Sequence, residues 1–113
     1  MFVSKSQPPE RQELRVAGLP APLSHYTDAV RFGNILFVSG LTAHDAGGQL
    51  VGGTDAAEQT RQILINLKLV LDAAGATMAD VLKVTVFLTD ITDRAAINPS
   101  GRNSLAPQDR PAP

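Results

Sequence analysis

The chain of 113 residues has no cysteine and no tryptophan. Without cysteine there is no disulfide stapling, no thiolate catalysis and no cysteine-ligated metal, which fits a cytoplasmic location. The two histidines, His25 and His44, are too few for a zinc site, which needs further ligands at workable geometry. We expect no metal, and we interpret both histidines as surface residues.

Excess charge and long apolar runs are also missing. Ten Lys and Arg residues against eleven Asp and Glu residues give a formal net charge of -1. Nothing supplies the positive field that nucleic-acid binding needs. No stretch is long enough to span a membrane, and polar residues 7–11 follow the first residues instead of a signal-peptide core. We therefore expect a cytoplasmic protein with neither nucleic acid nor membrane as partner.

The length suits one domain with a thin core, so association with copies of itself would help. Residues 1–18 are polar and contain proline, and we interpret them as an N-terminal arm with one helical turn around residues 10–16. Residues 28–32 alternate between apolar and polar, residues 35–39 form a largely apolar run, and Gly33-Asn34 lies between them. This arrangement predicts a β-hairpin. The second strand is apolar on both faces, which predicts helices over one face and another subunit over the other.

The clearest helix begins at Thr54 or Asp55, where Asp55 and Glu58 have the spacing of a capping box. Gly75 is its expected C-terminal stop. Three-four spacing predicts one buried face made of Ile63, Leu64, Leu67, Val70, Leu71 and Ala74. Arg61, Asn66 and Lys68 are assigned to the opposite face.

Residues 77–80 predict a single turn, and the β-branched residues 81–88 predict a strand. Thr92 is a candidate cap for a second helix over residues 93–98, which we expect to be aborted because Pro99 follows. Residues 99–113 have no periodicity and are interpreted as a disordered or non-family tail. The fold class is therefore α+β, with helices packed on one face of a sheet that is incomplete at the C-terminus.

Several stretches, in this order and spacing, resemble the reactive-intermediate deaminase family (RidA, or YjgF). They are Tyr26, Ala29-Val30, Gly33-Asn34 and residues 37–40; residues 48–53; residues 59–62, Asn66-Leu67 and residues 71–75; and residues 80–90. The match covers residues 19–98, which we take as the RidA-like domain. Each piece alone is weak, but their order and spacing together are specific.

The resemblance implies a chorismate-mutase-like fold with a mixed sheet, assembled as a homotrimer with clefts between subunits. It implies hydrolysis of enamines or imines, such as 2-iminobutanoate and 2-iminopropanoate, to ammonia and a 2-oxo acid. No cofactor or metal is implied. The partner is then a small 2-imino or enamine acid.

Four residues match the family's substrate-binding cleft. Tyr26 matches its tyrosine, Ser39 and Gly40 match the strand-end pair that lines the pocket, and Asn98 matches a cleft asparagine. Plainer roles stay open: Tyr26 packing at the hairpin edge, Ser39 and Gly40 ending a strand, and Asn98 as a polar helix end. The family's arginine, whose planar guanidinium suits a bidentate grip on a carboxylate, has no counterpart that we can align, nor has its water-positioning glutamate.

The tail is compatible with a frameshift. With codons displaced by one base, residues 103–105 can give Glu-Phe-Phe, and the stretch from Asp109 can give Arg-Pro-Ala followed by Arg or Ser. Phe-Phe and Pro-Ala-Arg are what the family is expected to carry there. Other codon choices are open, and a divergent natural C-terminus is the alternative.

Three functional hypotheses follow: a deaminase of this family, a non-catalytic trimer that binds small molecules, or an inactive frameshifted remnant. The neutral charge and single tyrosine give no support to the ribonuclease activity described for some members.

Overall fold

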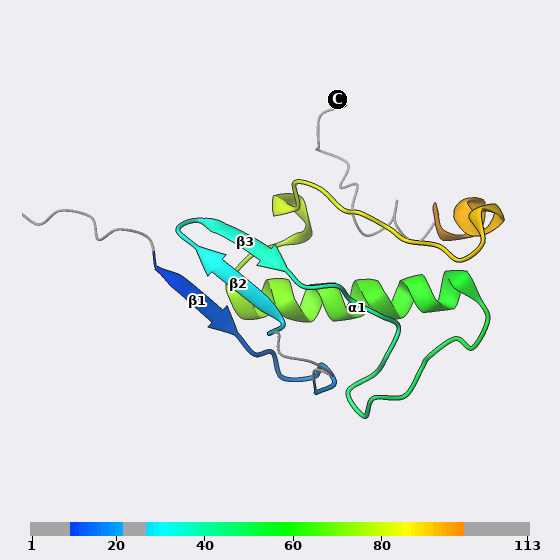
Figure 1. Cartoon of the computed structure of the whole chain (residues 1–113), viewed down its shortest axis with the longest axis horizontal. Helices are drawn as coiled ribbons and strands as arrows, with labels where there is room; N and C mark the ends of the chain where they lie inside the picture. The colour runs from blue at the N-terminus through cyan, green and yellow to red at the C-terminus, as the bar shows by residue number, and fades with distance from the viewer. Residues whose placement is uncertain (1–9, 22–26, 99–113) are drawn as a thin grey trace, which may run out of the picture.

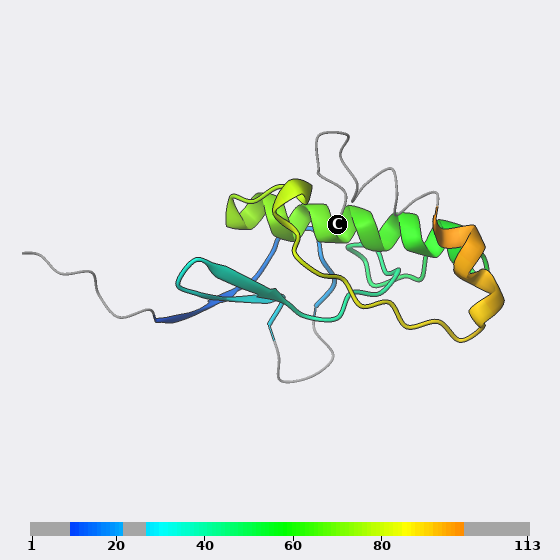
Figure 2. The same cartoon turned by 90° about the horizontal axis from the view of Figure 1, so that it is seen from above.

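A computed structural model describes residues 10–21 and 27–98 of the chain. Three strands, β1 (Arg11–Leu14), β2 (Ala29–Phe32) and β3 (Ile35–Val38), form an antiparallel sheet in the order β1-β2-β3. The long helix α1 (Ala56–Ala74) lies along one face of this sheet (Figures 1 and 2). Two short 3₁₀ turns follow, η1 (Met78–Asp80) and η2 (Ile91–Asp93). The expected α+β class, with a helix packed on one sheet face, is confirmed.

The segment interpreted as an arm contains a strand. The helical turn expected over residues 10–16 is wrong, because Arg11–Leu14 is β1 and pairs with β2. Its register sets Arg11 opposite Phe32 and Leu14 opposite Ala29. The alternation of polar side chains along a short edge strand resembles one turn of a helix, and only the partner strand decides between them. Residues 1–9 lie outside the described part of the chain.

The hairpin prediction is confirmed. β2 and β3 pair with Phe32 opposite Ile35, so Gly33-Asn34 is a two-residue connection. Gly33 takes a φ of 63°, a conformation that glycine adopts without steric cost and that tight hairpin turns need. The two-residue turn therefore sets the register of β2 and β3.

The core lies between the sheet and α1. Ala29 of β2 and Val70 of α1 are fully buried and pack with Val16. The partly buried side chains around them are Leu14, Leu19, Leu36, Val38 and Leu69. The Arg31 side chain also reaches from β2 to the end of α1 and donates a hydrogen bond to the carbonyl of Ala74. A cation is favourable at this end of a helix, where unpaired carbonyls carry partial negative charge.

Helix α1 begins and ends where expected. The Asp55 side chain accepts from the amides of Ala57 and Glu58, and Gly75 is left-handed with a φ of 76°. The capping box is only half formed, because the Asp55 amide donates to the Gly52 carbonyl at 2.8 Å while Glu58 pairs with Arg61. The expected burial of Val70 and Leu71 is confirmed, but the assignment of Asn66 to the opposite face is wrong: it is 2% exposed.

Residues 81–88 are extended but pair with no strand among the described residues, so the predicted strand is not formed there. Figure 1 shows this segment, in yellow, running clear of the edge of β3. Leu82 and Phe87 are 93% and 91% exposed. A strand pattern fixes an extended backbone, but a strand needs a neighbour to pair with. The mixed sheet is thus not seen in the part that the structure describes, where the sheet is antiparallel.

The turn expected over residues 77–80 is confirmed as η1. The second helix does form, since η2 continues in α-helical conformation over residues 94–98. Its cap is Asp90, whose side chain accepts from the Thr92 amide at 2.9 Å, and not Thr92 as expected. Within residues 10–21 and 27–98, no helix has the length and apolar character needed to cross a membrane.

Candidate functional site

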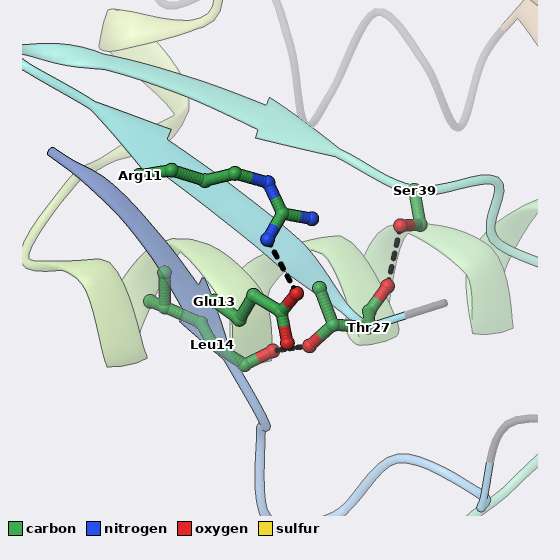
Figure 3. A network of polar contacts seen from close by, with 5 residues as sticks. All are labelled: Arg11, Glu13, Leu14, Thr27 and Ser39. Carbon is green, nitrogen blue, oxygen red and sulfur yellow. Dashed lines mark hydrogen bonds and ion pairs between the residues drawn. The ribbon is translucent and has the colours of Figure 1, made fainter. Parts of the chain in front are cut away.

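A ladder of polar contacts joins the three strands at the end where β3 stops (Figure 3). The Ser39 hydroxyl donates to the carbonyl of Thr27, and the Thr27 hydroxyl donates to the carbonyl of Leu14 at 2.6 Å. Thr27 is 7% exposed, so each bond satisfies a group that has little access to water. The ladder therefore ties Ser39, through Thr27, to the end of β1.

Asp28 adds a second set of contacts at the same end of the sheet. Its carboxylate accepts from the Val16 amide at 2.7 Å, and its own amide donates to the Leu14 carbonyl at 3.2 Å. The Ser39 amide donates to the Asp28 carbonyl at 3.1 Å. The strand end that carries Ser39 is therefore held by backbone and side-chain bonds together.

Gly40 follows Ser39 at the exposed start of the next loop. A Cβ built at Gly40 meets nothing within 4 Å, and Gly40 is not among the glycines of positive φ. Gly40 thus needs no left-handed turn conformation, and the plainer role of Ser39 and Gly40 at a strand end stays open, because β3 ends at Val38. Space next to the backbone is what this position offers.

The loop of residues 41–53 runs from Gly40 to the start of α1 and is tied to that helix. The Asn66 amide group donates to the carbonyls of Thr42, at 3.1 Å, and His44, at 2.9 Å. Near the other end, a Cβ on Gly52 would lie 2.9 Å from the backbone nitrogen of Gln59. The Gln59 side chain also donates to the Gly53 carbonyl. The loop is thus anchored near both ends.

The four predicted site residues are not all brought together. Ser39 and Gly40 are adjacent at the strand end, and Tyr26 and His25 lie outside the described residues. Asn98 is exposed at the end of the helical segment 91–98, which Figures 1 and 2 show apart from the end of β3. Within this one chain, the geometry of the site rests on Ser39 and Gly40.

Several cations of the described chain already have partners. Arg31 binds the end of α1, and Arg11 pairs with Glu13 at 2.6 Å (Figure 3). Arg61 pairs with Glu58 at 3.3 Å and Lys68 with Asp72 at 2.8 Å. Arg15, Lys83 and Arg94 are exposed. The His44 ring lies 2.8 Å from the Thr42 hydroxyl, and no three metal-binding side chains gather in the described ranges.

Asn66 is the residue that the sequence pattern placed wrongly. It lies four residues before Val70 and three after Ile63, so the spacing itself puts it on the buried face. The prediction followed the polarity of Asn66 instead of its position on the helix. A buried amide in an apolar stripe is a signal for a specific hydrogen-bonded partner, here the loop carbonyls.

The profile of the family described as Endoribonuclease L-PSP matches residues 16–113. A RutC family protein of Pyrococcus horikoshii is 45% identical over 80 residues, covering 70% of this chain and 63% of the relative. The chain thus spans less than two thirds of that relative's length. The 3-aminoacrylate deaminase RutC of Acinetobacter baylyi is 39% identical over 95 residues, covering 84% of this chain and 75% of the relative.

Two solved structures of Rid proteins also match this chain. A protein of unknown function from the conserved Rid family of Yersinia pestis superimposes with a TM-score of 0.83 at 30% identity. The match covers 91% of this chain and 82% of that one. RidA from an Antarctic Psychrobacter species gives a TM-score of 0.79 at 32% identity, covering 89% and 80%.

Proposed function

The chain belongs to the Endoribonuclease L-PSP family, which includes the RutC and Rid proteins, and from this membership we propose that it deaminates small enamine or imine acids beside Ser39 and Gly40. The observation that carries the proposal is the fixed strand end with open space next to it. Ser39 is held through Thr27, and Gly40 leaves room for a ligand against the backbone.

The reaction is a hydrolysis. An enamine first becomes its imine by taking a proton on carbon and losing one from nitrogen, and water then adds to the imine carbon to form a carbinolamine. Protonation of the nitrogen lets the carbon–nitrogen bond break, which releases ammonia and leaves a carbonyl group. Substrate plus one water balances ammonia plus the oxo acid, so no oxidant or metal enters the balance.

Ser39 has a limited part in such a site. A hydroxyl has one proton to donate, and the structure gives that proton to the Thr27 carbonyl. Its remaining lone pairs accept hydrogen bonds, which suits a substrate N–H group or a water molecule and not a carboxylate. Ser39 therefore orients the nitrogen or the attacking water in this proposal.

The proposed substrates are 2-iminobutanoate and 2-iminopropanoate. The Acinetobacter relative bears the name of a 3-aminoacrylate deaminase, which makes 3-aminoacrylate the other substrate to test. All three are short acids that carry a hydrolysable carbon–nitrogen bond. In this proposal Tyr26 and Asn98 complete the cleft, and Asn98 does so from a neighbouring copy of the chain.

A homotrimer is part of the same proposal. Phe32, Ile35 and Phe37 stand on the sheet face opposite to α1 and are 50%, 49% and 63% exposed. Their neighbours Leu36 and Val38 point into the core. A contiguous apolar patch on a strand face is typical of a surface that another protein covers. Copies of this chain are the occupants that we propose.

A scaffold that binds small molecules without turnover is the second candidate. It is favoured by the charges: Arg31 is bound to the end of α1, and the guanidinium that would grip a substrate carboxylate has no counterpart that we can align in the 113 residues. A binding site that lacks this grip would hold ligands weakly. The two candidates differ in turnover, not in where the ligand lies.

The test is ammonia release from 2-iminobutanoate, formed in place from threonine by a dehydratase, with purified chain shown to be folded by circular dichroism. We expect hydrolysis above the blank, and 3-aminoacrylate is assayed in parallel. A rate equal to the blank for both substrates, with 2-oxobutanoate still shifting the Ser39 and Gly40 amide signals, would favour the scaffold. Cleavage of RNA in place of either activity would overturn both candidates.

A further inference from the structure

Asn66 is the most buried polar side chain among the described residues, with 2% of its surface exposed. It is held from three directions. Its side-chain nitrogen donates to the Thr42 and His44 carbonyls, and its oxygen accepts from the Gln62 side chain at 3.0 Å. Three hydrogen bonds leave little of its capacity unused. Such a group specifies one arrangement of the elements that it joins.

The two carbonyls belong to the loop that continues directly from Gly40. Thr42 is two residues beyond Gly40, and the Thr42 and His44 carbonyls accept from Asn66, which lies 24 and 22 residues further along the chain. Between the two anchored carbonyls lies Ala43, which is buried, and its carbonyl accepts from the Val51 amide at 2.8 Å. The outgoing and returning arms of the loop are therefore joined at the point that Asn66 holds.

Local turn chemistry does not explain this anchor. The tip of the loop is organised by Asp45, whose carboxylate accepts from the amides of Gly47 and Gln49 at 3.0 Å each. Those contacts shape the tip but do not fix it to the helix. Among the described residues, the Asn66 contacts tie the first part of the loop, Thr42 to His44, to α1, while the Gln59 contact ties its end at Gly53.

We propose that Asn66 is a positioning residue, which holds the loop after Gly40 so that the space beside Ser39 and Gly40 keeps its shape for the ligand; this rests on the proposed function. A donor of two hydrogen bonds is essential in this role. Aspartate has the same shape but, ionised, only accepts, so it would face two carbonyl oxygens without a proton to offer. Loss of the donors frees the loop at its first anchor.

The experiment compares three variants with the wild-type chain. Asn66→Asp removes the donors and keeps the shape, and Asn66→Ser is uncharged but too short to reach both carbonyls. The matched control is Gln62→Met, which removes only the bond to the Asn66 oxygen. We measure KM and kcat for 2-iminobutanoate, and amide hydrogen exchange at Asp45 and Val51, whose amides bond within the loop.

We expect both Asn66 variants to raise KM about tenfold with a smaller change in kcat, since a misplaced loop weakens binding before chemistry. Exchange should speed up at Asp45 and Val51 and stay unchanged at Ser39, while Gln62→Met behaves like the wild type in both assays. Unchanged KM and exchange in folded Asn66→Ser would overturn the proposal. If the wild type shows no turnover, the proposed function fails, and exchange alone then decides whether Asn66 anchors the loop.

Discussion

The Ser39 hydroxyl donates its hydrogen bond to the backbone carbonyl of Thr27, just beyond the paired ends of β2 and β3. Ser39 is thereby both a structural link of the sheet and a residue of the proposed site. The two roles are separable, because Thr27 supports the same ladder through its own hydroxyl bond to Leu14 and is not proposed to touch the ligand.

Ser39→Ala and Thr27→Val should have similar effects on stability and different effects on activity. Each removes one side-chain donor from the ladder, which costs about 1 kcal/mol of unfolding free energy. Only Ser39→Ala removes the oxygen that faces the proposed ligand, so deamination should fall well beyond the change seen in Thr27→Val. Urea unfolding and the ammonia assay check the pair. Equal activity losses in both variants would assign Ser39 a structural role alone.

Gly40→Ala should be folded and impaired. A methyl group at Gly40 enters open space, and the residue needs no left-handed conformation, so we expect a stability change within about 0.5 kcal/mol. The methyl group occupies room that the proposed ligand needs, and KM should rise. The measurement is a steady-state titration with 2-iminobutanoate, alongside thermal unfolding.

Gly52→Ala is the contrasting variant. Its φ of 89° disfavours any side chain, and its Cβ would lie 2.9 Å from the Gln59 nitrogen. We expect a loss of more than about 1 kcal/mol. If Gly40→Ala proves as destabilising as Gly52→Ala, the space beside Gly40 is not free in the folded protein.

How far the sequence leads depends on whether a feature is local. The hairpin at Gly33, the helix start at Asp55 and the stop at Gly75 follow from short-range chemistry, and the structure has all three. β1 was missed because a short polar segment becomes a strand only through its partner β2. The pattern of residues 81–88 predicted a strand that is not formed among the described residues, because pairing is a long-range property that no local pattern contains.

For the candidate site, too, the sequence led to some residues and missed another. Ser39 and Gly40 were named by resemblance, and their role as site residues stays a prediction; the structure shows Ser39 bonded to the Thr27 carbonyl and open space beside Gly40. Asn66 was missed because its polarity suggested a solvated face, whereas its hydrogen-bonding partners come from a loop more than 20 residues earlier. Contacts across such a distance in sequence appear only once the chain is folded.

Phe37→Glu should break the assembly of copies proposed for the outer sheet face. Phe37 is 63% exposed on that face, and a buried carboxylate without a partner is costly. Leu50→Glu is the control, because Leu50 is similarly exposed at 54% but lies in the loop before α1. Light scattering after gel filtration should show a trimer for the wild type and for Leu50→Glu, and monomers for Phe37→Glu. A wild-type monomer would remove the trimer from the proposal.

The helical segment 91–98 should fray in acid through Asp90. Hydrogen bonds from the Thr92 hydroxyl and then from the Thr92 amide hold the pKa of the Asp90 carboxyl below its usual value. A carboxyl whose pKa is lower in the folded state stabilises that state above its unfolded pKa, about 3.9. The contribution is lost as the pH falls through the folded value, because protonation removes the charge that accepts both bonds.

The Thr92 amide signal should therefore titrate below about pH 3.9, with faster amide exchange over residues 91–98. Asp90→Asn keeps an acceptor that does not titrate, so its profile should be flat over the same range. An identical acid transition in Asp90→Asn would place the titrating group elsewhere.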